Sequence, residues 1–278
     1  MSSPGVSASS VPPSAASSMV SRGLSAASTR LGAAAWLCIW LCIWWAGVIV
    51  SGVSPDFLPS PWQVAQKLVW LAQSENRIGE GTLWVHAGWS VLRFLSGFLL
   101  ALAVGVPLGL LMGQSRPVGD LLTPLFNALR NVPPIAWAPF SLLWFGASFG
   151  SQTFVIFTAA FPPILMNAFR GIRLVDEGLI NAARMLGAGP GTVLFRVGLP
   201  AAIPLVVAGA RIGVANGWLA LIGAEIVAGP GALTGLGFLI LVGQQNLQAV
   251  FSIGAMVVIG FIGALFDFVM VRVERRFT

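Results

Sequence analysis

The chain has 278 residues, of which 56% are hydrophobic and only 9% are charged, and its mean hydropathy is +0.87. Soluble domains usually carry about 25% charged residues, so this composition excludes an ordinary soluble protein and indicates an integral membrane protein. The pI near 11.2 does not indicate nucleic-acid binding, because the basic residues are thinly spread and several flank apolar runs. A single histidine excludes a histidine-based metal cluster.

The first 30 residues are mainly Ser, Ala, Pro and Gly, with no acidic side chain. Such a segment cannot bury enough apolar surface to fold, so residues 1–30 are expected to be a disordered cytosolic tail and 31–278 a membrane domain. The apolar run at about 31–53 is longer than a signal-peptide core and predicts a retained anchor helix. Cys38 and Cys42 within it are interpreted as apolar helix residues rather than as a metal or redox pair.

Apolar runs predict an all-α membrane protein, because about 20 apolar helical residues cross the hydrocarbon core. Six spans are expected, at about 31–53, 86–113, 118–145, 151–170, 201–228 and 250–272. The third of these contains prolines that kink a helix, namely Pro124, Pro133, Pro134 and Pro139. A short amphipathic helix is expected at 62–73, and a shallow or re-entrant helix within 229–248.

Lys and Arg are distributed asymmetrically around these spans. Only Lys67 and Arg77 fall in segments of one side, whereas ten arginines fall on the other: Arg22, Arg30, Arg116, Arg170, Arg173, Arg184, Arg196, Arg272, Arg275 and Arg276. The side with more positive charge is the cytosolic one. Both termini are therefore predicted in the cytosol, with residues 54–85 and 229–248 outside.

Several charged residues fall within or near the ends of predicted spans, where charges are costly and usually face the protein interior. Arg93 and Glu225 lie near the outer ends of their spans and are expected to pair, although each could instead extend to water. Asp267, near an inner end, is expected close to the arginine-rich C-terminus.

Arg130 and Arg211 are predicted near mid-depth, with no carboxylate at that level. They line a route for an anionic solute, or they bond to carbonyls freed by Pro133 and Pro134. Asn131 is a further intramembrane polar candidate. The asparagines (Asn127, Asn131, Asn167 and Asn216) are expected to be scattered and to bond between helices, so that no deep solute site is expected.

The most polar internal segment, 170–200, predicts a cytosolic helix–turn–helix. Asp176 is a suitable N-cap for a helix over 177–186, and Gly187 is a suitable stop. Pro190 can begin a second short helix that Leu199-Pro200 ends. A polar segment with an apolar stripe, held clear of the bilayer, is suited to dock into a groove on a partner.

Part of this segment resembles a known family. Asn181-Ala182-Ala183, Gly187, Val197 and Leu199-Pro200 have the spacing of the pattern E-A-A-x3-G-x9-[I/V]-x-L-P. This pattern is the signature loop of permease subunits in binding-protein-dependent ABC importers. The one departure is Asn181 in place of Glu, which removes a charge available for a salt bridge to an ATPase.

The resemblance extends over about residues 55–276, and within the family the chain is similar to the aliphatic sulfonate, taurine and nitrate branch. It rests on Leu58-Pro59-Ser60-Pro61, 93–98, Arg130-Asn131-Val132-Pro133, Leu143-Trp144-Phe145-Gly146 and Ala224-Glu225. It implies a type I importer fold in a bacterial inner membrane, two permease copies, cytosolic ATPases that bind ATP and Mg, and an extracytoplasmic solute-binding protein. Solute selectivity is expected mainly in that binding protein.

Other function classes have less support. A secondary transporter or channel for a small solute would need coupling-ion carboxylates at the midplane, and none is placed there. A membrane enzyme would need a catalytic pair, and none is clustered. The Gly187–Thr192 segment looks like a phosphate-binding loop but lacks its lysine, so ATP hydrolysis is expected from another chain and no cofactor from this one. Nitrate, taurine, other alkanesulfonates and heterocyclic precursors remain possible solutes.

Overall fold

The computed structural model describes residues 32, 35–73, 78, 81–229 and 234–277, so the expected tail at 1–30 lies outside the described residues. The chain divides after Pro61 into two units. The first contains the helix Ala35–Ser51, at the place of the first expected span and shorter than the four spanning helices of the second unit.

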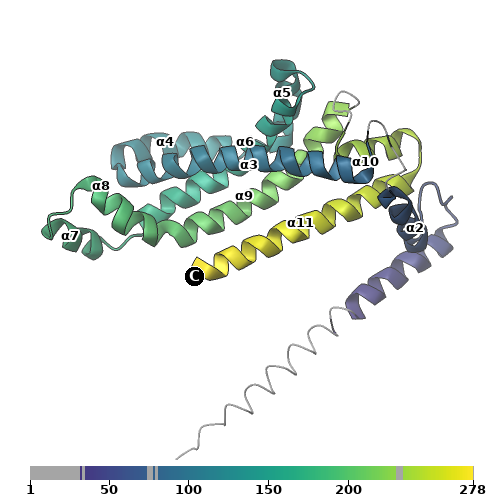
Figure 1. The fold of residues 1–278 in the computed structure, drawn as a ribbon, viewed down its shortest axis with the longest axis horizontal. Helices are drawn as coiled ribbons and strands as arrows, with labels where there is room; N and C mark the ends of the chain where they lie inside the picture. Colours follow the sequence, from purple (N-terminus) through teal and green to yellow (C-terminus); the bar gives the residue numbers. More distant parts are fainter. Residues whose placement is uncertain (1–31, 33–34, 74–77, 79–80, 230–233, 278) are drawn as a thin grey trace, which may run out of the picture. The chain divides into compact units, whose positions relative to one another are not determined.

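The second unit, which begins at Trp62, is helical, and its described residues contain only a single isolated bridge, between Ile78 and Gly81. Four of the described helical runs are long and apolar enough to cross a membrane. They are α3 (Leu83–Gln114), α6 (Phe149–Arg173), the run Pro190–Ala228 that contains α9 (Leu199–Ala228), and α11 (Ala249–Phe277). Within this unit they lie lengthwise, with α6 packed between α3 and α9 and with α11 against α9 (Figure 1).

Small residues allow α3 and α9 to approach α6 closely. On α3 they recur every fourth residue, at Gly97, Ala101, Gly105, Gly109 and Gly113. A Cβ added at Gly109 would lie only 2.5 Å from the carbonyl oxygen of Leu165 on α6. A second stripe on α9, formed by Gly209, Gly213 and Gly217, also packs against α6. Helices in a membrane associate largely through such close packing, because lipid provides little hydrophobic drive between them.

Aromatic side chains pack α3, α9 and α11 together at their centre. The Phe94 ring lies 4.7 Å from that of Phe266 and 5.6 Å from that of Trp218, measured between centroids. The Trp218 indole also donates a hydrogen bond to the carbonyl of Ile259 at 3.2 Å. A buried indole N–H needs an acceptor, so this hydrogen bond favours one position of α11 along the axis of α9.

The third expected span, 118–145, is not one helix. It consists of α4 (Arg116–Leu129), a 3-10 turn η1 (Pro134–Trp137) and α5 (Ala138–Phe145). The break falls at Pro133-Pro134, where two amide donors are missing and the residue before each proline is driven away from helical geometry. Pro124, by contrast, is accommodated inside α4. The prolines therefore interrupt the span and do more than kink it.

The two short helices expected near the outer side are present. The amphipathic helix is α2 (Pro61–Ala72), whose Leu71 is buried against the core of the second unit. The short helix expected within 229–248 is α10 (Leu236–Gln245), which contacts α9 and α11. Neither is long enough to span a bilayer.

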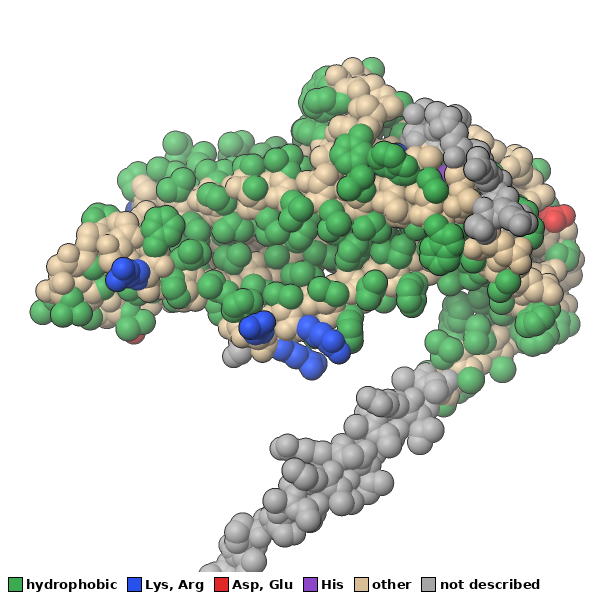
Figure 2. Space-filling model, viewed as in Figure 1, with side chains coloured by type: hydrophobic (Ala, Val, Ile, Leu, Met, Phe, Trp, Pro, Cys, Tyr) green, Lys and Arg blue, Asp and Glu red, His purple; other side chains and the backbone are tan. Residues whose placement is uncertain are grey.

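Hydrophobic side chains cover most of the face of the second unit seen in Figure 2. The visible Lys and Arg side chains gather near α7 (Glu177–Met185) and at the C-terminal end of α11, which carries Arg272, Arg275 and Arg276. An apolar flank with basic ends is the surface expected of a helical membrane protein.

Candidate coupling surface and intramembrane polar sites

The predicted helix–turn–helix is present between α6 and α9. The Asp176 side chain accepts a hydrogen bond from the Gly178 amide at 2.7 Å and so caps α7. Gly187 follows with φ +82°, a left-handed conformation that residues with a Cβ adopt only with strain. Pro190 then begins α8 (Pro190–Val193). The helix start, the stop and the second start all fall where the sequence predicts them.

The C-terminal boundary of this segment differs from the expectation. Leu199-Pro200 does not end the second helix, because α8 passes through a π-helical turn, Leu194–Gly198, directly into α9. Pro200 lies at the start of α9, directly after the π-helical turn, so a proline is accommodated at this junction without ending the helix. Val197 and Leu199 therefore belong to one continuous helical path from α8 into the bundle.

The α7–α8 segment lies at one end of the second unit (Figure 1), and it exposes several apolar side chains. Leu179 is exposed, and Met185 and Leu186 are each 89% exposed. Asn181 and Ala182 are exposed, whereas Ala183 is half-buried. Exposed apolar groups of this size on a polar loop mark an interaction site, although the residues that carry the family pattern are only partly on this surface.

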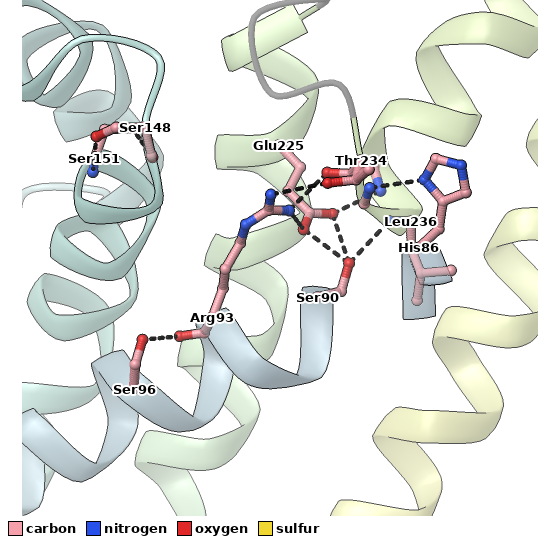
Figure 3. A network of polar contacts seen from close by, with 11 residues as sticks. His86, Ser90, Arg93, Ser96, Ser148, Ser151, Glu225, Thr234 and Leu236 are labelled. Carbon is pink, nitrogen blue, oxygen red and sulfur yellow. Dashed lines mark hydrogen bonds and ion pairs between the residues drawn. The ribbon is translucent and has the colours of Figure 1, made fainter. Parts of the chain in front are cut away.

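A second polar element lies where the N-terminal part of α3 meets the end of α9, as shown in Figure 3. The Arg93 guanidinium lies 3.1 Å from the Glu225 carboxylate, and Glu225 is fully buried. The pairing expected from the sequence is therefore present. Its position between helices, away from the solvent, also excludes the alternative in which each group extends to water.

Further donors surround Glu225. The Ser90 hydroxyl donates to it at 2.8 Å, and the Gly237 amide donates at 2.8 Å. Arg93 in turn donates to the carbonyl of Thr234 at 2.7 Å. The network thus connects α3 and α9 to the segment that leads into α10, and each buried charge has several partners, as burial requires.

His86 extends the same network. Its Nδ1 accepts a hydrogen bond from the Gly235 amide at 2.9 Å, while its Nε2 lies 2.8 Å from the Ile78 carbonyl, which it contacts as a donor. These roles require the neutral ring. His86, Ser90 and Thr234 are not among the residues predicted from the sequence. A signal was present, because His86, Ser90 and Arg93 recur at the i, i+4, i+7 spacing of one helix face.

The prediction that Arg211 has no carboxylate at its level is wrong. Arg211 is not unpaired, because its guanidinium lies 3.0 Å from Asp267 and 2.9 Å from Glu274, both on α11. Asp267, expected close to the arginine-rich C-terminus, lies on the same helix as Arg272, Arg275 and Arg276 and forms its ion pair with Arg211. Arg211 lies in the N-terminal half of α9, and the two acids lie in the C-terminal half of α11. Because the two helices pack antiparallel, these halves are side by side.

Arg130 follows α4 directly and lines a cavity of about 660 Å³ between the α4–η1 region, α6 and α9. Its guanidinium forms no ion pair or hydrogen bond with the residues that the structure describes. Asn131 is exposed and is not among the lining residues. Two asparagines expected to be scattered, Asn167 and Asn216, instead share this cavity with Arg130.

Comparisons with known proteins agree with this arrangement. Residues 105–278 match the family model described as the binding-protein-dependent transport system inner membrane component. The taurine transport system permease TauC of Escherichia coli is 35% identical over 87% of this chain and 86% of its own length. The nitrate import permease NrtB of a Synechocystis strain is 34% identical over 79% of this chain and 80% of its own.

Two further similarities bear on family and fold. The bicarbonate transport permease CmpB of Synechococcus elongatus is 36% identical over 68% of this chain and 67% of its own length. Among solved structures, an inward-facing form of the MetNI methionine ABC transporter matches 77% of this chain and 99% of its own, with a TM-score of 0.60 and 22% identity. At that identity the match shows the type I importer permease fold alone. From the family model and these relatives, the chain is a member of the inner-membrane permease components of binding-protein-dependent ABC transport systems.

Proposed function

We propose that this chain is the membrane-spanning permease subunit of an ATP-driven importer for a small anion, coupled to a separate ATPase through the 176–200 loop. The observation that carries the proposal is the capped α7–α8 element, with exposed Leu179, Met185 and Leu186 standing at one end of a membrane bundle. The chain belongs to a family of transport-system permeases, and an ATPase subunit is the partner that we propose for this surface.

The coupling follows from the helical continuity of this segment. An ATPase that closes on ATP would draw the α7–α8 surface with it. Because α8 runs through the π-turn into α9 without a loop, that displacement is passed to a helix of the bundle. Asn181 has no negative charge, so docking depends more on apolar contact than on a salt bridge from this position. Hydrolysis then resets the spans, and no bond-breaking residue is assigned to this chain.

The remaining partners and the solute class follow from the relatives. Proteins named for taurine, nitrate and bicarbonate transport are similar over most of their length, and these solutes all carry an anionic group. We assign a small anion such as an aliphatic sulfonate, taurine or nitrate to this chain. An extracytoplasmic solute-binding protein would deliver it, two permease copies would form the pathway, and both termini would lie in the cytosol of a bacterial inner membrane.

The test places bulk and charge on the proposed docking surface. Gly187→Arg and Ala183→Asp should leave the protein inserted but abolish uptake into membrane vesicles and reduce co-purification of the ATPase. Gly52→Arg is the matched control, because Gly52 also has a positive φ, also has open space at its Cβ position, and lies far along the chain from the loop. Asn181→Glu should be tolerated. Full transport by Gly187→Arg at normal expression would exclude this loop as the coupling element.

A further inference from the structure

The cavity between α6, α9 and the α4–η1 break has an unbalanced positive charge. Arg130 and Arg170 both line it, and its lining includes no Asp or Glu. Neither guanidinium has a carboxylate partner among the described residues, so no acid of the described chain neutralises the charge of this cavity. Two arginines without a carboxylate partner that line one cavity give it a positive electrostatic potential, which favours an anionic ligand.

The polar groups of the cavity suit an oxyanion. A guanidinium offers a planar set of five donors that matches sulfonate and carboxylate oxygens. Asn167 already donates to the Pro163 carbonyl at 2.8 Å, but its amide has further hydrogen-bonding capacity. Asn216 is exposed to the cavity and forms no side-chain hydrogen bond with the described residues. All four side chains converge from three different segments of the chain.

Apart from Thr158, the rest of the wall is apolar. It includes Leu129, Ile135, Met166, Ile212 and Leu219. A volume of about 660 Å³ lies within the range of small-ligand pockets, which combine an apolar wall with a few placed polar groups. An inorganic anion would leave this wall uncovered, whereas a short alkyl chain would bury against it.

From this geometry we infer that the cavity is a binding site, within the permease itself, for a small organic anion with a short alkyl body, held by Arg130 and Arg170. The inference rests on the proposed importer function and narrows its solute class from anions in general to organic ones. It replaces the expectation that no deep polar site exists, because tertiary packing brings together residues separated by up to 86 positions, from Arg130 to Asn216.

The test measures binding to the full-length chain in nanodiscs of neutral phosphatidylcholine, with ethanesulfonate as the anion and ethyl methyl sulfone as its neutral counterpart. Ethanesulfonate should bind and the sulfone should not, and nitrate should bind more weakly than ethanesulfonate. Arg130→Gln and Arg170→Gln should each weaken ethanesulfonate binding about tenfold, the effect of losing a hydrogen bond between charged groups. Arg130→Lys, which keeps the charge, should retain part of the affinity.

Two controls keep the result interpretable. Arg272→Gln removes the same charge from α11, outside the cavity, and should leave affinity unchanged. Asn216→Leu removes only a neutral polar group and should weaken binding about fivefold, so a loss does not depend on the arginine variants folding correctly. Equal binding of the sulfone, or wild-type affinity in the Arg130→Gln/Arg170→Gln double variant, would overturn the inference.

An anionic lipid headgroup has the same charge as the solute and could occupy the same cavity, so a separate experiment distinguishes the two ligands. In nanodiscs with added phosphatidylglycerol, ethanesulfonate should compete with any bound lipid. Retention of lipid by the wild-type chain but not by the double variant, without competition from ethanesulfonate, would assign the cavity to lipid and overturn the inference. Because none of these measurements uses the ATPase, they succeed or fail independently of the co-purification that tests the proposed function.

Discussion

At the scale of single residues, the buried pair of Arg93 and Glu225 places a strong constraint on the end of the bundle next to α10. Both side chains are almost fully enclosed, and Glu225 collects bonds from Ser90, Arg93 and Gly237. A buried carboxylate that loses its cation is left with an uncompensated charge, which costs about 3–5 kcal/mol in folded stability. Removing the charge of both partners avoids that penalty.

Arg93→Ala should therefore lower the melting temperature of the purified protein strongly, while Arg93→Ala/Glu225→Gln should recover part of the loss. The measurement is thermal unfolding in detergent as a double-mutant cycle. Arg272→Ala is the control, because that guanidinium lies at the end of α11 over the ring of Phe268, and it should change stability little. Additive effects of the two substitutions would show that Arg93 and Glu225 do not depend on each other.

A second residue-scale prediction concerns Arg211, which binds Asp267 and Glu274 instead of lining a route for solute. Arg211→Gln should lower thermal stability, because α9 and α11 lose a contact and two acids lose their shared cation. Uptake per folded protein should remain close to that of the wild type. Loss of uptake in Arg211→Gln with an unchanged melting temperature would contradict this prediction and indicate that Arg211 acts in the solute pathway.

At the scale of helices, the contact between α3 and α6 depends on the absence of side chains. Gly109→Ala would place a Cβ against the Leu165 carbonyl and force the two helices apart, so we expect a loss of about 1–3 kcal/mol in stability, typical of overpacking. Gly88→Ala on the same helix meets nothing within 4 Å and should be neutral or stabilising, since alanine favours helix. Thermal unfolding of both variants compares them, and equal melting temperatures would contradict this account.

At the scale of the whole molecule, the arginine asymmetry predicts both termini and the 176–200 loop on the cytosolic side. After replacement of Cys38 and Cys42 by serine, Asp56→Cys and Gly191→Cys place single exposed thiols on opposite predicted sides. An impermeant maleimide added to intact cells should label position 56 and spare position 191. Permeabilised cells provide the control for reactivity at 191, and the reverse pattern would invert the topology.

Much of the architecture is predictable from local sequence. Apolar length determines the long helices α3, α6, α9 and α11, because each satisfies its own backbone hydrogen bonds whatever lies beside it. Asp176, Gly187 and Pro190 set the boundaries of α7 and α8 through capping and backbone conformation, which are also local. The residue spacing of the signature loop also predicts the family, which the comparisons show independently.

What the tertiary structure decided is which residues meet. Helix lengths do not specify the rotation of one helix against another, and that rotation pairs Arg211 with α11 while it leaves Arg130 and Arg170 facing one cavity. Residues at the proline break, Pro134 among them, line that cavity, although the prolines by themselves are also compatible with a kinked span. Charges and asparagines that are far apart along the chain acquire a function only when packing brings them to the same depth and side, because electrostatic and hydrogen-bonding interactions act over a few ångströms of space and not along the sequence.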